Sequence, residues 1–164
     1  MSCERLLTDT IKGGDRDLLQ TLIDVQDLVK DKLQEIRVSP WNKTLLHVAA
    51  ETKGNFHIID LLTDVFRDVN VKTLREQTPL HCAADVNIAK KLVEAGGKAD
   101  QTDQFGESPA MAAARNNHWD VAEFLIVYNG FVTNMSNKFG QTLQSMAALW
   151  EAPSSVKRLL QAQS

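Results

Sequence analysis

Residues 78–84 read TPLHCAA, and three diverging copies of this heptapeptide occur elsewhere in the chain. The copies are TLLHVAA at 44–50, SPAMAAA at 108–114 and TLQSMAA at 142–148, and successive copies begin 34, 30 and 34 residues apart. A period of about 33 residues is typical of folds that stack one supersecondary unit on the next. The chain of 164 residues is therefore predicted to be a short solenoid rather than one compact globular domain.

The residues around the copy at 108–114 predict how a unit begins. Gly106 closes a predicted hairpin turn at 103–106, where glycine is free to take a positive φ. Ser108 is a favourable N-cap, and Pro109 suits the first position of a helix. We therefore expect a turn followed by a first helix.

The residues that follow predict the rest of the unit. Asn117 stands in a predicted interhelix turn at 116–118, and apolar residues at 121–125 recur at helical spacing. Asn129 and Gly130 tolerate left-handed geometry and predict the end of this second helix.

The heptapeptide, its period and these turns resemble the ankyrin repeat, most closely at 78–84 and 103–125 and least before residue 40. The resemblance implies an all-α solenoid of about five helix-turn-helix units with short β-hairpin loops, in one domain spanning 1–164. The predicted units are an atypical N-terminal cap at 1–39, repeats at 40–73, 74–102 and 103–136, and a C-terminal cap repeat at 137–164.

Two irregularities interrupt the period. The third unit is about three residues short between Ala84 and Ile88, so its interhelix turn is expected to be clipped. The first unit contains an amphipathic stretch at 27–36 without Gly or Pro. This stretch predicts either a helical extension of the cap or a separate docking helix.

Composition narrows the function classes. The net charge of −3 is spread along the chain without a basic stripe, which disfavours direct binding to nucleic acid or to an anionic membrane. Two cysteines exclude a disulfide framework and suit a reducing compartment. We see no signal peptide and no membrane span, and so we expect a cytoplasmic or nuclear protein that is a monomer when free.

The four histidines raise the possibility of a metal site or an active site. His47 and His81 stand in the repeated motif, and in ankyrin-like units this residue ties the helix start to the neighbouring turn. Equivalent residues would lie roughly 10 Å apart, too far to share a metal ion. No nucleophile or phosphate-binding motif occurs. We expect no enzyme, no catalytic residue, no cofactor and no metal.

The resemblance implies that the chain binds a protein partner through a concave surface made of hairpins and inner helices. Trp41, Arg75, Phe105 and Phe139 share one register at the predicted hairpin tips, where they form either a recognition strip or finger-on-finger packing. Trp150, on the last inner helix, either closes the core or extends the binding face.

Further candidates follow from the same register. The concave surface is predicted to include Lys43, Glu51, Thr52, Gln77, Asp85, Gln104, Glu107, Arg115, Asn116, Lys138, Gln141 and Leu149. Asn70 resembles the site that cytosolic asparaginyl hydroxylases accept in ankyrin repeats, and is a possible modification site.

Two functions compete. A short chain made almost wholly of repeats suits an inhibitor that occludes its partner, as the inhibitors of Rel-type transcription factors or cyclin-dependent kinases do. Irregular repeats also suit an adaptor or scaffold, or a host-directed effector that recruits a partner.

Overall fold

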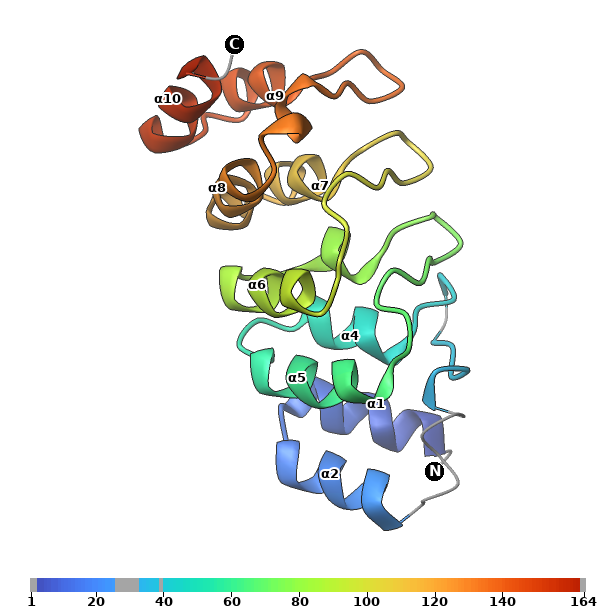
Figure 1. The fold of residues 1–164 in the computed structure, drawn as a ribbon. Helices are drawn as coiled ribbons and strands as arrows, with labels where there is room; N and C mark the ends of the chain where they lie inside the picture. Colours follow the sequence, from blue (N-terminus) through green and yellow to red (C-terminus); the bar gives the residue numbers. More distant parts are fainter. Residues whose placement is uncertain (1–2, 26–32, 39, 163–164) are drawn as a thin grey trace.

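The computed structural model describes residues 3–25, 33–38 and 40–162, and in this part of the chain helix pairs stack one on another (Figure 1). The inner helices are α1 (Cys3–Gly13), α4 (Leu45–Glu51), η1 (Pro79–Cys82, a 3₁₀ turn), α7 (Pro109–Arg115) and α9 (Leu143–Leu149). The outer helices are α2 (Arg16–Val25), α5 (Phe56–Val65), α6 (Val86–Glu94), α8 (Trp119–Tyr128) and α10 (Ser154–Ala162). A second 3₁₀ helix, η2 (Gly130–Asn134), follows α8.

Each inner helix packs on its own outer helix and on the inner helix of the neighbouring unit. Figure 1 shows hairpin loops, which we call fingers, projecting on one side of the stack, with the outer helices on the other. Within the described residues the fingers form only isolated bridges, Val38 with Lys43 and Ser136 with Thr142, and no sheet. The predicted all-α repeat fold is confirmed.

The repeated heptapeptide places a side-chain oxygen at the start of the inner helices after α1. The side chains of Thr44, Ser108 and Thr142 accept a hydrogen bond from the backbone N–H three residues on. This bond satisfies a donor that would otherwise have no partner in the first turn. Capping thus explains why each copy of the motif begins with Thr or Ser.

The core runs continuously through the stack because the inner helices carry small side chains. Ala49, Ala113 and Ala147 are almost fully buried where neighbouring inner helices meet. Larger apolar residues of the outer helices cover them. In the predicted stripe on α8, Val121, Ala122 and Leu125 are buried, while Phe124 is half-buried against the core. Each unit therefore buries its core against its neighbours.

Three of the fingers share one turn chemistry. Thr73, Asp103 and Asn137 each accept, through a side-chain oxygen, backbone N–H bonds from the residues two and four positions on. The residue three positions on is left-handed, with φ of 59° at Glu76, 75° at Gly106 and 74° at Gly140. The predicted positive φ of Gly106 is confirmed.

The backbone after α7 and after α8 can be compared with the prediction. Asn117 lies in the predicted interhelix turn and has φ of 61°. Asn129 has φ of −137° and Gly130 begins η2, so the predicted left-handed end of α8 is wrong. The prediction for the stretch at 27–36 cannot be followed, since 26–32 lies outside the described residues.

The shortening of the third unit falls on its inner helix. η1 has four residues, whereas α4, α7 and α9 each have seven. The short turn is possible because Asp85 caps α6 after only two non-helical residues, and the Ala84 N–H donates to the Ala50 carbonyl of the preceding unit at 3.0 Å. The three-residue gap therefore removes a helical turn. The interhelix segment at 83–85 is as long as the one at 116–118, so the prediction of a clipped interhelix turn is wrong.

Candidate functional site

The predicted tip residues lie in one row, because backbone hydrogen bonds join each finger to the next. Leu74 N donates to Trp41 O at 3.0 Å, Gln104 N to Arg75 O at 3.0 Å, and Lys138 N to Phe105 O at 2.8 Å. A Cβ atom on Gly106 would lie 3.2 Å from Lys138 N, so glycine also permits this close approach. The row is thus held in register by main-chain contacts.

The side chains of the row form two pairs. The Arg75 guanidinium lies 3.6 Å from the centroid of the Trp41 ring, and the Phe105 and Phe139 ring centroids are 6.2 Å apart. Phe139 is 69% exposed, while Trp41 and Phe105 are 38% and 37% exposed. The row therefore packs finger on finger and also presents aromatic surface. Its role in binding remains a prediction.

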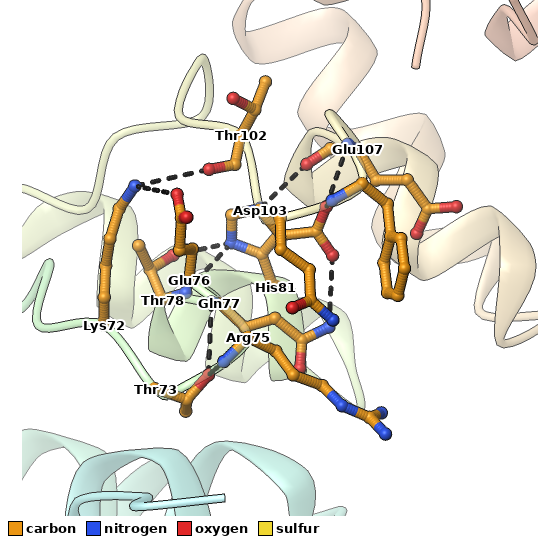
Figure 2. A network of polar contacts seen from close by, with 12 residues as sticks. Lys72, Thr73, Arg75, Glu76, Gln77, Thr78, His81, Thr102, Asp103 and Glu107 are labelled. Atoms are coloured by element: carbon orange, nitrogen blue, oxygen red, sulfur yellow. Dashed lines mark hydrogen bonds and ion pairs between the residues drawn. The ribbon is translucent and has the colours of Figure 1, made fainter. Parts of the chain in front are cut away.

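The motif histidines tie units together, as the resemblance implied. His81 Nδ1 accepts from the Thr78 N–H at 3.1 Å, so its Nε2–H donates to the Glu107 carbonyl at 3.0 Å (Figure 2). His47 makes the same bonds with Thr44 and the Gln77 carbonyl. Burial lowers the pKa of each to about 4, so both are neutral at pH 7 and serve as fixed connectors.

The described side chains around these histidines offer neither a reactive thiol nor a metal-binding group. Burial, with nearby Glu51, raises the pKa of Cys82 to about 12, which keeps the thiol protonated and unreactive at pH 7. In the described ranges, no group of three or more His, Cys, Asp or Glu side chains is arranged to hold a metal ion. No helix in the described part of the chain is long and apolar enough to span a membrane.

Several predicted surface residues bridge neighbouring fingers or helices. Gln77 Nε2 lies 3.5 Å from Asp103 Oδ2 (Figure 2), and Lys138 Nζ donates to the Gln104 carbonyl at 2.6 Å. Gln141 Oε1 accepts from the side chain of its own turn residue, Asn137, at 2.9 Å. These contacts limit the freedom of the polar groups that would face a partner.

Two predicted surface residues are buried, which corrects their assignment to an open concave surface. Asp85 is 9% exposed, because its carboxylate caps α6 at Ile88 N and accepts from Gly54 N at 2.8 Å. Glu107 is 4% exposed, and its Oε2 accepts from Arg115 Nε at 2.8 Å. Register alone did not reveal these positions, since their side chains turn inward to satisfy neighbouring donors.

A hollow of about 260 Å³ gathers many of the remaining candidates on the concave side. We call it the notch; it is lined by Trp41, Lys43, Glu51, Arg75, Gln77, His81, Cys82, Ala84, Arg115, Asn116 and His118. Sequence reasoning missed the part played by Cys82, Ala84 and His118. The three-residue gap in the period was the available signal.

The last predicted anchor lies elsewhere. Trp150 is the C-cap of α9 and is half-buried against the core. It also borders a separate hollow of about 440 Å³ with Leu149 and Arg115. Both predicted roles of Trp150, closing the core and extending the surface, are thus compatible with its position.

Asn70 has a structural part in the fold. Its side chain donates to the Gly96 carbonyl at 3.0 Å and accepts from the Lys98 N–H at 2.9 Å. It therefore joins the loop after α5 to the loop after α6. Its modification remains a prediction.

Comparison with known proteins supports the repeat assignment. A family model described as ankyrin repeats (3 copies) matches residues 7–99 and 85–164. No curated protein matches the chain.

Proposed function

Because the chain belongs to the ankyrin-repeat family, we propose that it binds a protein partner through its finger row and concave face without catalysing a reaction. The row of Trp41, Arg75, Phe105 and Phe139 carries the proposal. Aromatic residues and Arg are enriched among the residues that dominate interface energy. Here they are spaced by a main-chain ladder and need little reordering on binding.

We further propose that binding occludes the partner, so that the protein acts as an inhibitor in the cytoplasm or nucleus. The fingers and inner helices lie on one side of the stack (Figure 1), which favours one continuous contact surface. An adaptor or effector would instead hold two proteins at once. Occlusion predicts that the partner's other ligand competes with this chain, whereas an adaptor predicts a ternary complex by size-exclusion chromatography.

The test of binding is a comparison of two double variants. Partners would first be captured from cytosol by the parent chain and identified by mass spectrometry. The affinity of each would then be titrated with Phe105→Ala/Phe139→Ala and with Val127→Ala/Tyr128→Ala. The second pair is matched, because Val127 and Tyr128 are 65% and 56% exposed on the outer helix α8.

Loss of each anchoring ring should cost about 1–4 kcal/mol of binding free energy, as for interface hot spots, while the α8 pair should bind like the parent. Thermal melts of the same variants separate binding from packing. Equal affinity of the finger variant and the parent would refute the proposed surface. If the affinity of the finger variant falls only as far as its folding stability falls, the row serves finger-on-finger packing and not binding.

A further inference from the structure

The notch exists because the third inner helix lacks its last turn. Glu51 ends α4 and Arg115 ends α7, but η1 stops at Cys82 and has no residue at the corresponding level. Cys82 and Ala84 form part of the lining that this leaves between the two flanking helix ends. The notch thus lies between the ends of two inner helices, α4 and α7, that are not neighbours in the stack.

The lining carries an excess of positive charge. Lys43, Arg75 and Arg115 face a single carboxylate, that of Glu51, and Lys43 is already paired with it. Arg75 has no carboxylate within ion-pair distance among the residues that the structure describes, and its guanidinium points away from the polar network in Figure 2. Arg115 gives its Nε to Glu107 and remains 41% exposed at its side chain.

Both guanidinium groups are held in place before any ligand arrives. The Trp41 ring lies against Arg75, and the buried Glu107 carboxylate holds Arg115. Fixing donors in this way lowers the entropy lost on binding. The planar guanidinium matches the geometry of a carboxylate and can donate two parallel hydrogen bonds to it.

We propose that the notch receives the carboxylate of an acidic side chain on the protein partner, with Arg75 and Arg115 as its donors. This inference rests on the proposed protein-binding function and names the chemistry of one contact. The volume of about 260 Å³ falls below the usual range for small-molecule sites, roughly 300–1,000 Å³, and suits a single protruding side chain. Glu51 disfavours a doubly charged phosphate in the same space.

The test uses blocked tripeptides as probes, Gly-Glu-Gly, Gly-Gln-Gly and Gly-phosphoserine-Gly, titrated into the full chain at constant ionic strength. Nuclear magnetic resonance would follow the side-chain Nε–H signals of Arg75 and Arg115 and the indole N–H of Trp41. The Glu probe should shift all three with a Kd of a few to tens of millimolar, about tenfold tighter than the Gln probe. Absence of any shift at about 50 mM, or equal shifts from both probes, would overturn the proposal.

Three variants sharpen the result. Arg75→Gln and Arg115→Gln should each weaken the Glu probe about fivefold or more, since each removes one donor pair. Arg158→Gln is the matched control, because Arg158 lies on α10 with its Nε on the Ser154 carbonyl and should bind the probe like the parent. If Arg75→Gln has a lower melting temperature than the parent, Arg75→Lys tests the need for a planar donor while keeping the charge.

Failure of the notch can be distinguished from failure of the proposed function. A phosphoserine probe that binds more than about tenfold tighter than Glu would overturn the carboxylate assignment. Arg75 belongs to both the row and the notch, so Arg115→Gln is the variant that separates them. A captured partner that binds Arg115→Gln like the parent but loses affinity for Phe105→Ala/Phe139→Ala would refute the notch and leave the finger row intact. Probe binding without any captured partner would support a carboxylate-binding notch but contradict the proposed protein-binding function.

Discussion

At the scale of single residues, one position of the motif shows how neighbouring units are joined. His47 and His81 each reach a backbone carbonyl of the next finger, at 2.9 and 3.0 Å. Met111 occupies the same position in the fourth unit and has no hydrogen to donate to a carbonyl. The polar link thus joins the second unit to the third and the third to the fourth, while the position of Met111 relies on packing.

Substitution of His81 tests this link through pH. Its folded pKa of about 4 lies below the ordinary 6.5, so protonation favours the unfolded chain. The contribution to stability is complete above pH 6.5 and is lost as the pH falls toward 4, up to ~3 kcal/mol for this residue.

His81→Met should lower stability at pH 7 by about 1–3 kcal/mol, because Thr78 and Glu107 lose a buried partner. The same variant should flatten the decline between pH 6.5 and 4. Denaturant melts across this range provide the measurement. Parallel curves for the variant and the parent would contradict the assigned pKa.

A second residue-scale prediction concerns backbone strain. Glu76 has φ of 59°, at the turn position that glycine fills in the next two fingers. A left-handed conformation costs a non-glycine residue about 1–2 kcal/mol, partly offset by the greater freedom of glycine when unfolded. Glu76→Gly should therefore stabilise the chain by about 1 kcal/mol in denaturant melts.

Glu76→Gln is the control for this variant. It removes the exposed ion pair with Lys72, whose atoms lie 3.7 Å apart, without changing backbone preference. An exposed pair of this kind contributes little, so Gln should behave like the parent. Equal gains from Gly and Gln would show that charge, not conformation, is responsible.

At the scale of elements, the outer helices hold the stack through one buried stripe each. Leu125 on α8 is fully buried, and Leu125→Ala should destabilise the chain by about 2–5 kcal/mol. Val127→Ala, two residues on, removes apolar atoms from a side chain that is 65% exposed and should change stability by less than about 0.5 kcal/mol. Chemical denaturation of both variants distinguishes the two faces, and similar losses would show that the helix register is wrong.

The sequence was sufficient for most elements because caps and turns are local. Ser108 and Gly106 act through nearby backbone and have the predicted roles, and Thr44 caps α4 in the same way. The third unit differs, since a deletion can shorten either a turn or a helix. The choice depends on the carboxylate of Asp85, which bonds to Gly54 thirty-one residues away. Such a non-local contact cannot be read from spacing.

The sequence also predicted part of the candidate site. The shared register of Trp41, Arg75, Phe105 and Phe139 predicted a row, because the fingers repeat with the units. The pairing of side chains within the row and the inward turn of Glu107 depend on packing between units. The notch was not foreseen, because it arises from residues that are missing.

At the scale of the whole molecule, the stacked units predict an extended outline. A compact protein of 164 residues would have a radius of gyration of about 15 Å. We expect small-angle X-ray scattering of the free chain to give a larger value at the mass of a monomer. A compact value or a dimeric mass would contradict this arrangement or the predicted monomer.

The short η1 turn also has a consequence for the order in which the chain folds. An isolated helical turn does not persist in water, because nucleation costs more than its few bonds return. η1 therefore needs α4 and α7 on both sides, and the N–H of Ala84, two residues after η1, already bonds to the Ala50 carbonyl. Regular repeat arrays can start folding at any unit. In this chain we expect the units on either side of η1 to fold first and the η1 unit to fold last. In pulsed hydrogen exchange, the Ala84 amide should become protected later than that of Ala122, which lies within α8.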